Sequence, residues 1–368
     1  MGPTLHLLTT AADPLAGYDR AESVLFASAR GTLLTRGVRG VAAGDLADLA
    51  GRVDGPAAGA IGFDGTAHLI LPESETWSPP LPPGAAPLVS GGWWSRRVPE
   101  PAAYAAAVRA ALAELERGDL AKVVLARTVE LRSDEPIDLP GLLRPLLGHG
   151  YSFAAPLPGG RTLTGASPEL LVSRHGRAVV SNPLAGSAAR SADPAEDRRR
   201  AAALAASAKD LREHRLVVEA VADALAPYCS GLQVPGTPEL TSTESMWHLS
   251  TRVTGTLRDP GTRVLTLAAA LHPTPAVCGT PESGARRMIE ELEPFDRGFY
   301  AGLAGWTDAA GDGEWAVAIR CAEVAEHTLR LYAGAGIVTG SDPEAELAET
   351  SAKFRTMLRA LGVSDALV

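Results

Sequence analysis

The sequence predicts an α+β fold with a large β content. Short apolar runs interrupted by glycine and proline fill the N-terminal quarter, as is typical of strands and turns. The segment 122–131 is rich in β-branched residues, and 161–187 reads as strands joined by turns. Only a few segments repeat apolar residues at helical spacing. No internal repeat, heptad run or low-complexity tail indicates a solenoid.

The N-terminal part, residues 1–95, contains strand candidates at 24–26 and 60–63. The proline-rich segment 79–87 reads as a linker or long loop. Residues 1–11 have no Lys or Arg ahead of their apolar residues, so they do not resemble a secretion signal. No apolar run reaches the roughly 18 residues that a membrane helix needs. We therefore expect a cytoplasmic protein without a membrane segment.

A helix and a strand are expected next. Helical spacing begins after Pro101, and Gly118 stands where a C-cap is expected. The apolar face of this helix consists of Tyr104, Val108, Leu112 and Leu115. The segment 122–131 (KVVLARTVEL) then predicts a strand, which places Lys122 at the beginning of that strand.

Residues 161–187 predict three strands, separated by a turn at SPE and by a His-Gly turn. A single long helix is expected after them. Asp193 is its expected N-cap, Pro194 its first residue and Glu196 the capping-box partner. The apolar stripe of this helix consists of Leu204, Ala208, Leu211, Val218, Ala222 and Leu225.

The C-terminal part predicts two strands and a helix. The strands cover 314–324 and 328–338, and Asp342 with Pro343 opens the helix. Its apolar stripe consists of Leu347, Ser351, Phe354, Leu358 and Leu361.

Composition excludes several classes of function. The chain has 368 residues and a net charge of −9, which argues against nucleic acid or an anionic membrane as the main partner. An anionic substrate would need cations placed locally. Cys229, Cys278 and Cys321 are odd in number and form no CxxC motif, so neither a disulfide framework nor a zinc site is indicated.

Two predicted helices carry acidic faces. The C-terminal helix places Glu346 and Glu349 together, away from its apolar stripe. On the middle helix, Asp210 and Glu213 project from one side. Ordinary pairs with lysines four residues away would explain both faces. Alternatively, the two faces converge on a hard cation such as Mg²⁺, which takes one or two carboxylates and leaves positions for a substrate oxygen.

The last two predicted strands offer ligand contacts. Gly334 and Gly336 share one face, where missing side chains let a ligand approach the backbone, although a bulge or tight packing is the alternative. On the neighbouring strand, Arg320 shares a face with Ala316 and Ala318, so its guanidinium is free to bind a carboxylate unless it forms a surface salt bridge. The pattern indicates a Mg²⁺-dependent enzyme acting on a carboxylate-bearing substrate.

Several segments, read together, resemble the chorismate-utilising enzymes. They are KVVLART (122–128), GASPELLVSRHG (165–176), NPLAGS (182–187), KDLREH (209–214), HPTPAVCGTP (272–281), FDRGFYAGLAGW (295–306), YAGAGIVTGS (332–341) and ELAETSAK (346–353). They follow the family's order and spacing. The family contains isochorismate, salicylate, anthranilate and aminodeoxychorismate synthases. Closer to the N-terminus, FASARGTLLTRG (26–37) is similar to the corresponding segment of isochorismate synthases.

The resemblance implies one large domain over residues 1–368, with 96–368 as its catalytic core. Stacked antiparallel sheets flanked by helices are expected to enclose the active site. Mg²⁺ is the implied cofactor, chorismate the implied substrate and a monomer the implied state. No LLES-type tryptophan-binding segment and no fused amidotransferase are evident. Neither feedback by tryptophan nor an amidotransferase subunit is therefore expected.

Members of this family divide by nucleophile. Amine-transferring members have Lys in a PIKGT-like segment and Gln at the start of KVVLAR, where this chain has Ala185 and Lys122. By resemblance, Lys122 deprotonates a water that attacks C2 of chorismate, and Glu169 protonates the departing C4 hydroxyl. Such a lysine needs burial or nearby cations, Arg127 and Mg²⁺ among them, to favour its neutral form. Burial is expected to raise the pKa of Glu169.

The same match assigns the other site residues. Glu213 and Glu349 are implied to bind Mg²⁺ directly, with Asp210 and Glu346 acting nearby or through water. The residues implied to contact substrate are Arg320 and Tyr300 at the enolpyruvyl carboxylate, His248 and Lys353 in the pocket lining, and Gly334 and Gly336 through their backbones.

One position separates two products of water addition. Salicylate synthases, which go on to eliminate pyruvate, tend to have Thr where this chain has Ala276, whereas isochorismate synthases have Ala followed by an aliphatic residue. Ala276 with Val277 therefore favours isochorismate as the product. Salicylate synthase is the alternative, and a catalytically silent homologue is a further one. The residues do not distinguish siderophore, menaquinone or other downstream pathways.

Overall fold

The computed structural model describes residues 15–84 and 92–364. The segment 1–11, read above as unlike a secretion signal, lies outside the described residues, as does part of the expected linker 79–87. Among the described residues, no helix combines the length and apolar character needed to cross a membrane.

Most strands belong to one continuous antiparallel ladder of 17 strands. Its first leaf runs in the order β5 (Trp93–Val98), β6 (Lys122–Ser133), β20 (Thr328–Ile337), β19 (Cys321–Val324), β8 (Arg161–Ser167), β7 (Tyr151–Leu157) and β1 (Leu25–Ser28). The short β16 (Gly279–Thr280) pairs with the first residues of β6. The predicted strand over 122–131 is confirmed, with Lys122 as its first residue.

The long strand β2 (Gly31–Asp45) leads from the first leaf into the second, because it pairs with β1 at its beginning and with β4 along its length. A register shift between Val38 and Gly40 marks a bulge, which bends such a strand. The second leaf continues through β4 (Thr66–Ser78), β3 (Ala57–Ile61), β17 (Leu303–Thr307), β18 (Gly313–Val317), β9 (Leu170–His175), β10 (Ala178–Asn182), β15 (Val253–Leu257) and β12 (Cys229–Gln233).

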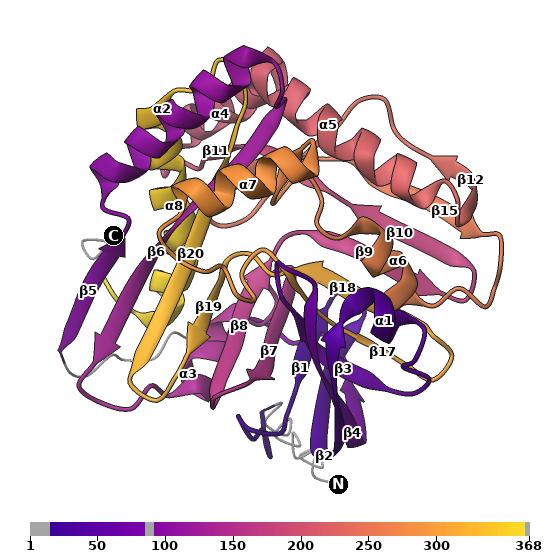
Figure 1. Cartoon of the computed structure of the whole chain (residues 1–368). Helices are drawn as coiled ribbons and strands as arrows, with labels where there is room; N and C mark the ends of the chain where they lie inside the picture. The colour runs from indigo at the N-terminus through magenta and orange to yellow at the C-terminus, as the bar shows by residue number, and fades with distance from the viewer. Residues whose placement is uncertain (1–14, 85–91, 365–368) are drawn as a thin grey trace, which may run out of the picture.

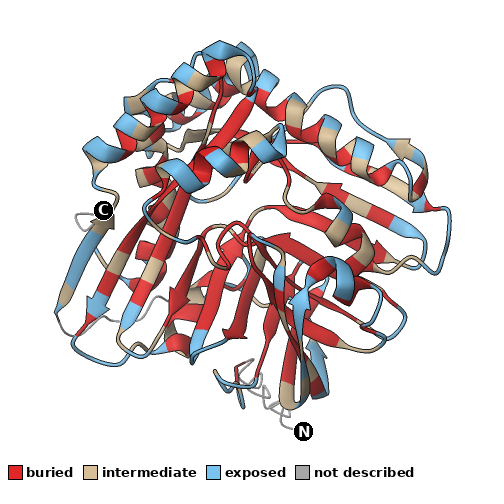
Figure 2. Cartoon of the chain, viewed as in Figure 1, coloured by how far each residue is buried: buried red, intermediate tan, exposed pale blue. Residues whose placement is uncertain are grey.

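Apolar side chains from both leaves meet in one core cluster. Phe26 and Phe153 come from the first leaf, and Trp306 and Trp315 from the second. Figure 2 shows buried residues along the central strands, while exposed residues follow the outer sides of the helices. The expected stacking of antiparallel sheets is therefore present, built from a single ladder that folds back on itself.

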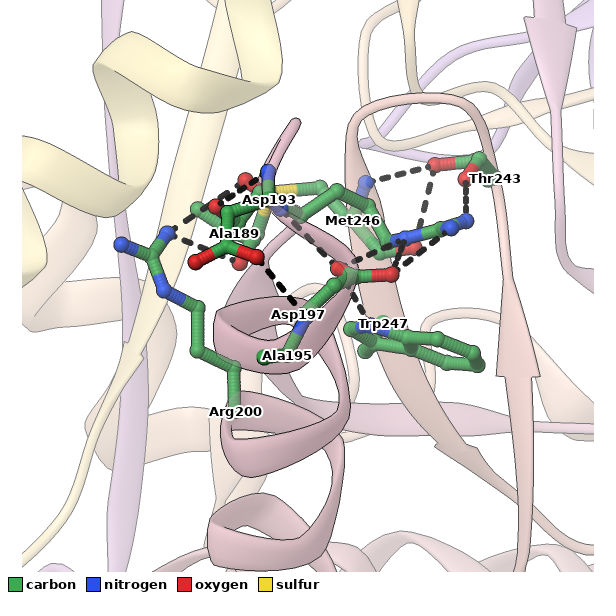
Figure 3. A network of polar contacts seen from close by, with 10 residues as sticks. Ala189, Asp193, Ala195, Asp197, Arg200, Thr243, Met246 and Trp247 are labelled. Carbon is green, nitrogen blue, oxygen red and sulfur yellow. Dashed lines mark hydrogen bonds and ion pairs between the residues drawn. The ribbon is translucent and has the colours of Figure 1, made fainter.

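A separate three-stranded sheet consists of β11 (Leu184–Ala189), β14 (Met246–Ser250) and β13 (Glu239–Ser242). It is fastened to α4 (Pro194–Ala206) through the carboxylate of Asp197 (Figure 3). That carboxylate accepts hydrogen bonds from the guanidinium of Arg190 at 2.9 and 3.0 Å and from the indole of Trp247 at 3.0 Å. Because both partners lie on or next to this sheet, the sheet and the helix form one unit.

Helices cover the sheets on one side and at the ends (Figure 1). Besides α4 they are α1 (Leu46–Ala50), α2 (Pro101–Arg117), α3 (Leu139–Leu143) with a following 3₁₀ turn (Arg144–Leu146), α5 (Ala208–Leu225), α6 (Val264–Leu271), α7 (Glu282–Leu292) and α8 (Pro343–Leu361). The predicted ends of α2 and α8 are confirmed. Gly118 adopts a left-handed φ of 89°, and Asp342 accepts a hydrogen bond from the Ala345 amide at the start of α8.

The expectation of one long middle helix is wrong, because the helix is interrupted at Ser207. This residue ends α4 in an extended conformation, and its hydroxyl accepts a hydrogen bond from the Asp210 amide as the N-cap of α5. The break also changes the buried stripe, since Ala208 is exposed while Glu213 and His214 are buried. A serine can cap or continue a helix, so periodicity alone did not reveal the break.

Two further expectations are wrong. Asp193 caps α4 as predicted, but its own amide donates to the hydroxyl of Ser191, whereas Glu196 pairs with Arg199 and Arg200 instead of completing a capping box. The predicted strand 314–324 is interrupted between β18 and β19. Arg320 lies in this interruption with a φ of 50°, so it is not on a strand face with Ala316 and Ala318.

Candidate active site

A narrow cavity lies where β6, β20, the three-stranded sheet, α5 and α8 meet. Its volume is about 60 Å³, enough for a few water molecules. The predicted site residues that line it are Glu169, Glu213, His248, Ala276, Tyr300, Arg320, Gly334, Gly336, Glu349 and Lys353. Three others, Lys122, Asp210 and Glu346, stand next to these residues without lining the cavity. The structure therefore brings together residues that span most of the chain.

Lys122 is completely buried at the beginning of β6. Its Nζ lies 3.0 Å from Oε1 of Glu213 on α5, yet no hydrogen bond from this ammonium to a described residue has suitable geometry. Arg127, expected to lie near Lys122, instead donates to the hydroxyls of Thr350 and Ser351 on α8. Residues an odd number of positions apart on a strand point to opposite faces, which explains this error.

Two glycines of β20 make room for these side chains. A Cβ on Gly336 would stand 2.0 Å from Oε1 of Glu213 and 3.0 Å from Cε of Lys122. A Cβ on Gly334 would stand 2.8 Å from the hydroxyl oxygen of Tyr300. These contacts are the tight packing that the sequence left as the alternative, and the approach of a ligand to this backbone stays a prediction.

On α8, Glu349 and Lys353 form the ordinary pair that the sequence left as one alternative. Nζ of Lys353 lies 2.5 Å from Oε1 of Glu349 and also donates to the carbonyl of Gly334 at 2.8 Å. The hydroxyl of Ser187 on β11 donates to the same carboxylate at 2.8 Å. Burial opposes ionisation, but Lys353 and Ser187 outweigh it, so the pKa of Glu349 is lowered.

The acidic faces of α5 and α8 do converge. Lys209 on α5 pairs with Glu346 on α8 at 2.5 Å, and not with Glu213 of its own helix. Burial, and then the charge of Glu349, raise the pKa of Glu346. Burial also raises the pKa of Asp210, with Glu213 and Glu349 adding to the effect. Repulsion among these carboxylates shows that the two faces lie within electrostatic reach of each other.

Glu169 occupies the loop between β8 and β9 and is 2% exposed. Burial raises its pKa to about 7, although the Leu184 amide donates to its carboxylate and the cations of Lys122, Arg320 and Lys353 act in the opposite direction. The expected upward shift is therefore present, and its cause is desolvation. At neutral pH this group is poised to give or take a proton.

Arg320 reaches the cavity from the interruption between β18 and β19. Its Nη2 lies 3.3 Å from Nε2 of His248 on β14, and its Nε has no hydrogen-bond partner among the described residues. Burial, followed by the charges of Arg320 and Lys353, lowers the pKa of His248 well below its usual value, so this imidazole is neutral. A buried guanidinium with an unused donor is suited to an anionic ligand.

Tyr300 forms another part of the wall. Its ring stacks on that of Tyr332 at 4.8 Å with 4° between the planes. Ala276 lies in the loop between α6 and α7, where its amide donates to the hydroxyl of Thr274 at 3.3 Å, and Val277 beside it is buried. The loop thus presents a methyl group and an aliphatic side chain to the cavity.

Sequence reasoning gave no role to several residues at this site. Ser187, Tyr332 and Ile319 line the cavity, and Ser187 lies in the quoted NPLAGS segment. Helical spacing groups His214 with Asp210 and Glu213 on α5, and its Nε2 lies 2.7 Å from the hydroxyl of Thr251. Their positions depend on contacts between elements far apart in the chain, which periodicity does not report.

The donor set suits a hard cation. No cluster of three or more His, Cys, Asp or Glu within 15–84 and 92–364 has a metal-binding arrangement. Glu213 and Glu349 nevertheless border one cavity from two helices, each facing a lysine. Mg²⁺ usually takes one or two carboxylates and fills its other positions with water or substrate oxygens. The two carboxylates therefore fit Mg²⁺.

Comparison with known sequences places this site in a family. The profile of a family described as chorismate binding enzyme matches residues 89–362. The chain is 56% identical over 319 residues to isochorismate synthase DhbC of Bacillus subtilis, covering 83% of this chain and 80% of that protein. It is 44% identical over 269 residues to isochorismate synthase EntC of Escherichia coli, covering 72% of this chain and 68% of that protein.

Solved structures agree. DhbC of Bacillus anthracis superimposes with a TM-score of 0.91 at 48% identity, covering 95% of this chain and 99% of that one. Anthranilate synthase component I of Streptococcus pneumoniae shares the fold, with a TM-score of 0.71 at 22% identity over 96% of this chain and 95% of that one. The chain, whose cavity is lined by carboxylates, Lys353 and the buried Arg320, belongs to the chorismate-binding enzyme family.

Proposed function

We propose that this protein is an isochorismate synthase, which converts chorismate to isochorismate by adding water at C2 and releasing the C4 hydroxyl. The observation that carries the proposal is that one buried site contains Lys122 and a glutamate, Glu169, whose pKa is about 7. One proton acceptor and one proton donor are what this exchange of hydroxyl groups requires. The names of DhbC and EntC support the same reaction.

Glu169 acts as the acid. Its carboxyl carries a proton in a large fraction of molecules at neutral pH, because burial raises its pKa to about 7. In the reaction it gives that proton to the departing C4 hydroxyl, which leaves as water. The Leu184 amide and Ser167, whose hydroxyl accepts from the Glu169 amide at 3.2 Å, hold the loop in place.

Lys122 acts as the base, and it accepts a proton from the attacking water. For this role its amine must be neutral when the water attacks. Its side chain is completely buried, and its Nζ lies 3.0 Å from Oε1 of Glu213. The proton that Lys122 takes and the one that Glu169 gives balance, so chorismate and isochorismate are isomers.

Mg²⁺ is proposed as the cofactor, held by Glu213 and Glu349, with Asp210 and Glu346 acting from nearby or through water. When bound, it supplies a positive charge for the ring carboxylate of the substrate. Ser187 donates a hydrogen bond to Glu349 and so orients the carboxylate of Glu349. Lys209 pairs with Glu346 and so limits repulsion among the acids.

The second carboxylate of the substrate, on the enolpyruvyl group, is assigned to Arg320 and Tyr300. Arg320 is buried and has an unused Nε donor, and the Tyr300 hydroxyl lies beside Gly334. His248 is neutral and orients Arg320. Lys353 and the backbones of Gly334 and Gly336 complete the proposed contacts.

Isochorismate is proposed as the final product because Ala276 places a methyl group, and no hydroxyl, in the cavity wall. Salicylate synthase, which eliminates pyruvate from isochorismate, is the competing function. We further propose that the protein acts in the cytoplasm as a monomer without an amidotransferase subunit. Its cysteines Cys229, Cys278 and Cys321 are free and buried, in keeping with a reducing compartment.

The direct test is an incubation of purified protein with chorismate, with and without Mg²⁺, followed by chromatography and proton NMR. A Mg²⁺-dependent mixture of chorismate and isochorismate without pyruvate is expected. Salicylate with pyruvate would assign the competing function. If chorismate stays unchanged, also with ammonium as the nucleophile, both synthase functions are contradicted. The protein would then be a catalytically silent homologue.

A further inference from the structure

A larger cavity, of about 670 Å³, lies directly outside the narrow one. The two share Pro168 and Arg320 in their linings, so these residues form the partition between them. Pro168 precedes the acid Glu169. Arg320 holds a left-handed φ of 50°, a conformation that costs energy for a residue with a side chain and therefore indicates that its position matters. The outer cavity thus reaches Arg320, which is proposed to bind substrate, and Pro168, which precedes the proposed acid Glu169.

Besides Pro83 and Gly84, three parts of the fold contribute to the walls of the outer cavity. One is the end of β13 with the turn that follows it, where Ser242 and Glu244 lie, and another is the loop after α3, with His149. The third is the last turn of α8, with Arg359. Nε2 of His149 lies 3.7 Å from Oε1 of Glu244, so the first two walls meet at the rim.

One wall is rigidly held. The turn between β13 and β14 belongs to the unit fastened to Asp197 on α4 (Figure 3). Arg190, whose guanidinium binds Asp197, also donates to the carbonyl of Thr243 at 3.2 Å and lies 4.5 Å over the ring of Trp247. The charge of Arg190 is therefore balanced by Asp197, although this arginine lines the outer cavity.

Two cationic side chains in the outer cavity form no ion pair with a described residue. Arg359 is exposed. Arg320 lies with its Nη2 3.3 Å from the neutral His248, and the carboxylates of Glu349 and Glu169 in the inner cavity act on its charge from further away. Among the described residues of the lining, Glu244 is the only acid. The described lining between Arg359 and Arg320 therefore carries more cationic than acidic side chains.

This arrangement matters because the chain as a whole has a net charge of −9 and repels anions. Cations within a concave, poorly hydrated mouth focus the local field and raise the concentration of an anion there. We propose that the outer cavity is the access chamber through which a dianionic substrate reaches the site, with Arg359 attracting it and Arg320 receiving it. This inference rests on the proposed function, in which the substrate carries two carboxylates.

Charge variants test the chamber through steady-state kinetics at several salt concentrations. Arg359→Gln is expected to lower kcat/KM about threefold at low ionic strength and to leave kcat unchanged, since Arg359 touches no reacting group. Glu244→Gln is expected to raise kcat/KM by about twofold under the same conditions. Both differences should vanish near 0.5 M salt, where the screening length falls to about 4 Å.

Arg132→Gln is the matched control, because Arg132 is exposed on β6, lies outside the outer cavity, and its substitution changes the net charge equally. It should leave kcat/KM within experimental error. Thermal melts of the variants check that differences in kcat/KM do not come from loss of folded protein. Equal kcat/KM for Arg359→Gln and Arg132→Gln at low salt would contradict the proposal that the outer cavity is the access chamber.

A bulky residue tests the route independently of charge. Ser242→Trp narrows the outer cavity from the exposed end of β13 and is expected to lower kcat/KM at every salt concentration, whereas Ser74→Trp at an exposed position of β4 should not. Unchanged kcat/KM in Ser242→Trp would place access elsewhere. If wild-type protein leaves chorismate unchanged, both the proposed function and the proposed access chamber are contradicted. If wild-type protein converts chorismate, the variants test the access chamber alone.

Discussion

A buried ion pair and a cluster of buried charged residues both lie close to β6. They differ in how far the protein itself supplies hydrogen-bond partners for their polar atoms. Arg297 binds Glu293 through two hydrogen bonds of 2.6 and 2.8 Å and also donates to the carbonyls of Val277 and Val124. The Ala126 amide completes the set by donating to Glu293 at 2.7 Å. The guanidinium of Arg297 and the carboxylate of Glu293 therefore have hydrogen-bond partners within the protein.

The cavity beside this pair is different. Lys122 lies near Glu213 without a hydrogen bond, Arg320 has an unused Nε, and Glu169 has burial as its main influence. Buried polar groups are rarely left without partners, since each such group costs free energy. The comparison separates an ion pair whose polar atoms are hydrogen-bonded within the protein from a cluster with unpaired polar atoms, and the cluster is where we propose that ligands bind.

The largest expected effect concerns Lys122. Lys122→Ala should lower kcat by about 10²–10⁴-fold, because the proposed base is removed. Circular dichroism and a thermal melt check that the variant is folded, because it loses the ion pair with the buried Glu213. Chorismate consumption followed by chromatography is the measurement. Turnover near that of the wild type would refute the proposed base.

The next effect tests the stabilising pair against the cluster. Arg297→Met should cost about 3–5 kcal/mol of unfolding free energy, because it leaves Glu293 charged, buried and unpaired. Arg320→Met should leave stability unchanged or higher, since it removes a buried charge that has no carboxylate partner, while KM rises at least about tenfold. Urea unfolding and steady-state kinetics measure the two. Equal losses of stability would remove the distinction drawn above.

Glu169 gives a smaller effect that depends on pH. Its folded pKa of about 7 lies above the usual 4.5. Ionisation is thus disfavoured in the folded state, and stability falls as pH rises from about 4.5 to 7. Glu169→Gln mimics the protonated acid, so it should be more stable than wild type by on the order of 2 kcal/mol at pH 8 and no different at pH 4.5. The difference is measured by urea unfolding.

The same pKa governs activity. Wild-type kcat should decline as pH rises through about 7, where Glu169 loses the proton it donates. Glu169→Gln should lose activity at every pH. A pH-independent stability difference between the two proteins would show that burial does not control this group.

The smallest effect concerns the proposed metal. Glu349→Gln should raise the Mg²⁺ concentration for half-maximal activity about tenfold, because one carboxylate ligand becomes an amide. Glu344→Gln is the control, as Glu344 is exposed on the same helix and pairs only weakly with Arg109 at 3.5 Å. If both variants respond alike to Mg²⁺, Glu349 is not a ligand.

Sequence reasoning predicted the fold class and several of its elements. The strand that begins at Lys122 and the helix ends at Gly118 and Asp342 follow from local signals: β-branched residues, a left-handed glycine and a capping aspartate. The errors have local causes as well. Ser207 and the interruption before Arg320 lie inside segments whose apolar pattern continues across them, so no periodicity marked the breaks.

For the site, the family motifs predicted ten of the residues that line the cavity, but not how they pair. Helical spacing offers Glu213 as one possible partner of Lys209, yet Lys209 binds Glu346 of another helix, and Glu213 lies next to Lys122. Spacing along one helix ranks only partners on that helix. Which lysine meets which carboxylate was settled by the packing of α5 against α8.

The sequence by itself determined the fold class, the ends of several elements and which residues bear charge, because propensity, capping and hydrophobic spacing are local properties. Only the tertiary structure decided that Glu169 is buried enough for a pKa of about 7, that Gly336 makes room for Glu213, and that Arg320 separates two cavities. Desolvation and close packing depend on everything that surrounds a group, and those surroundings come from segments hundreds of residues apart.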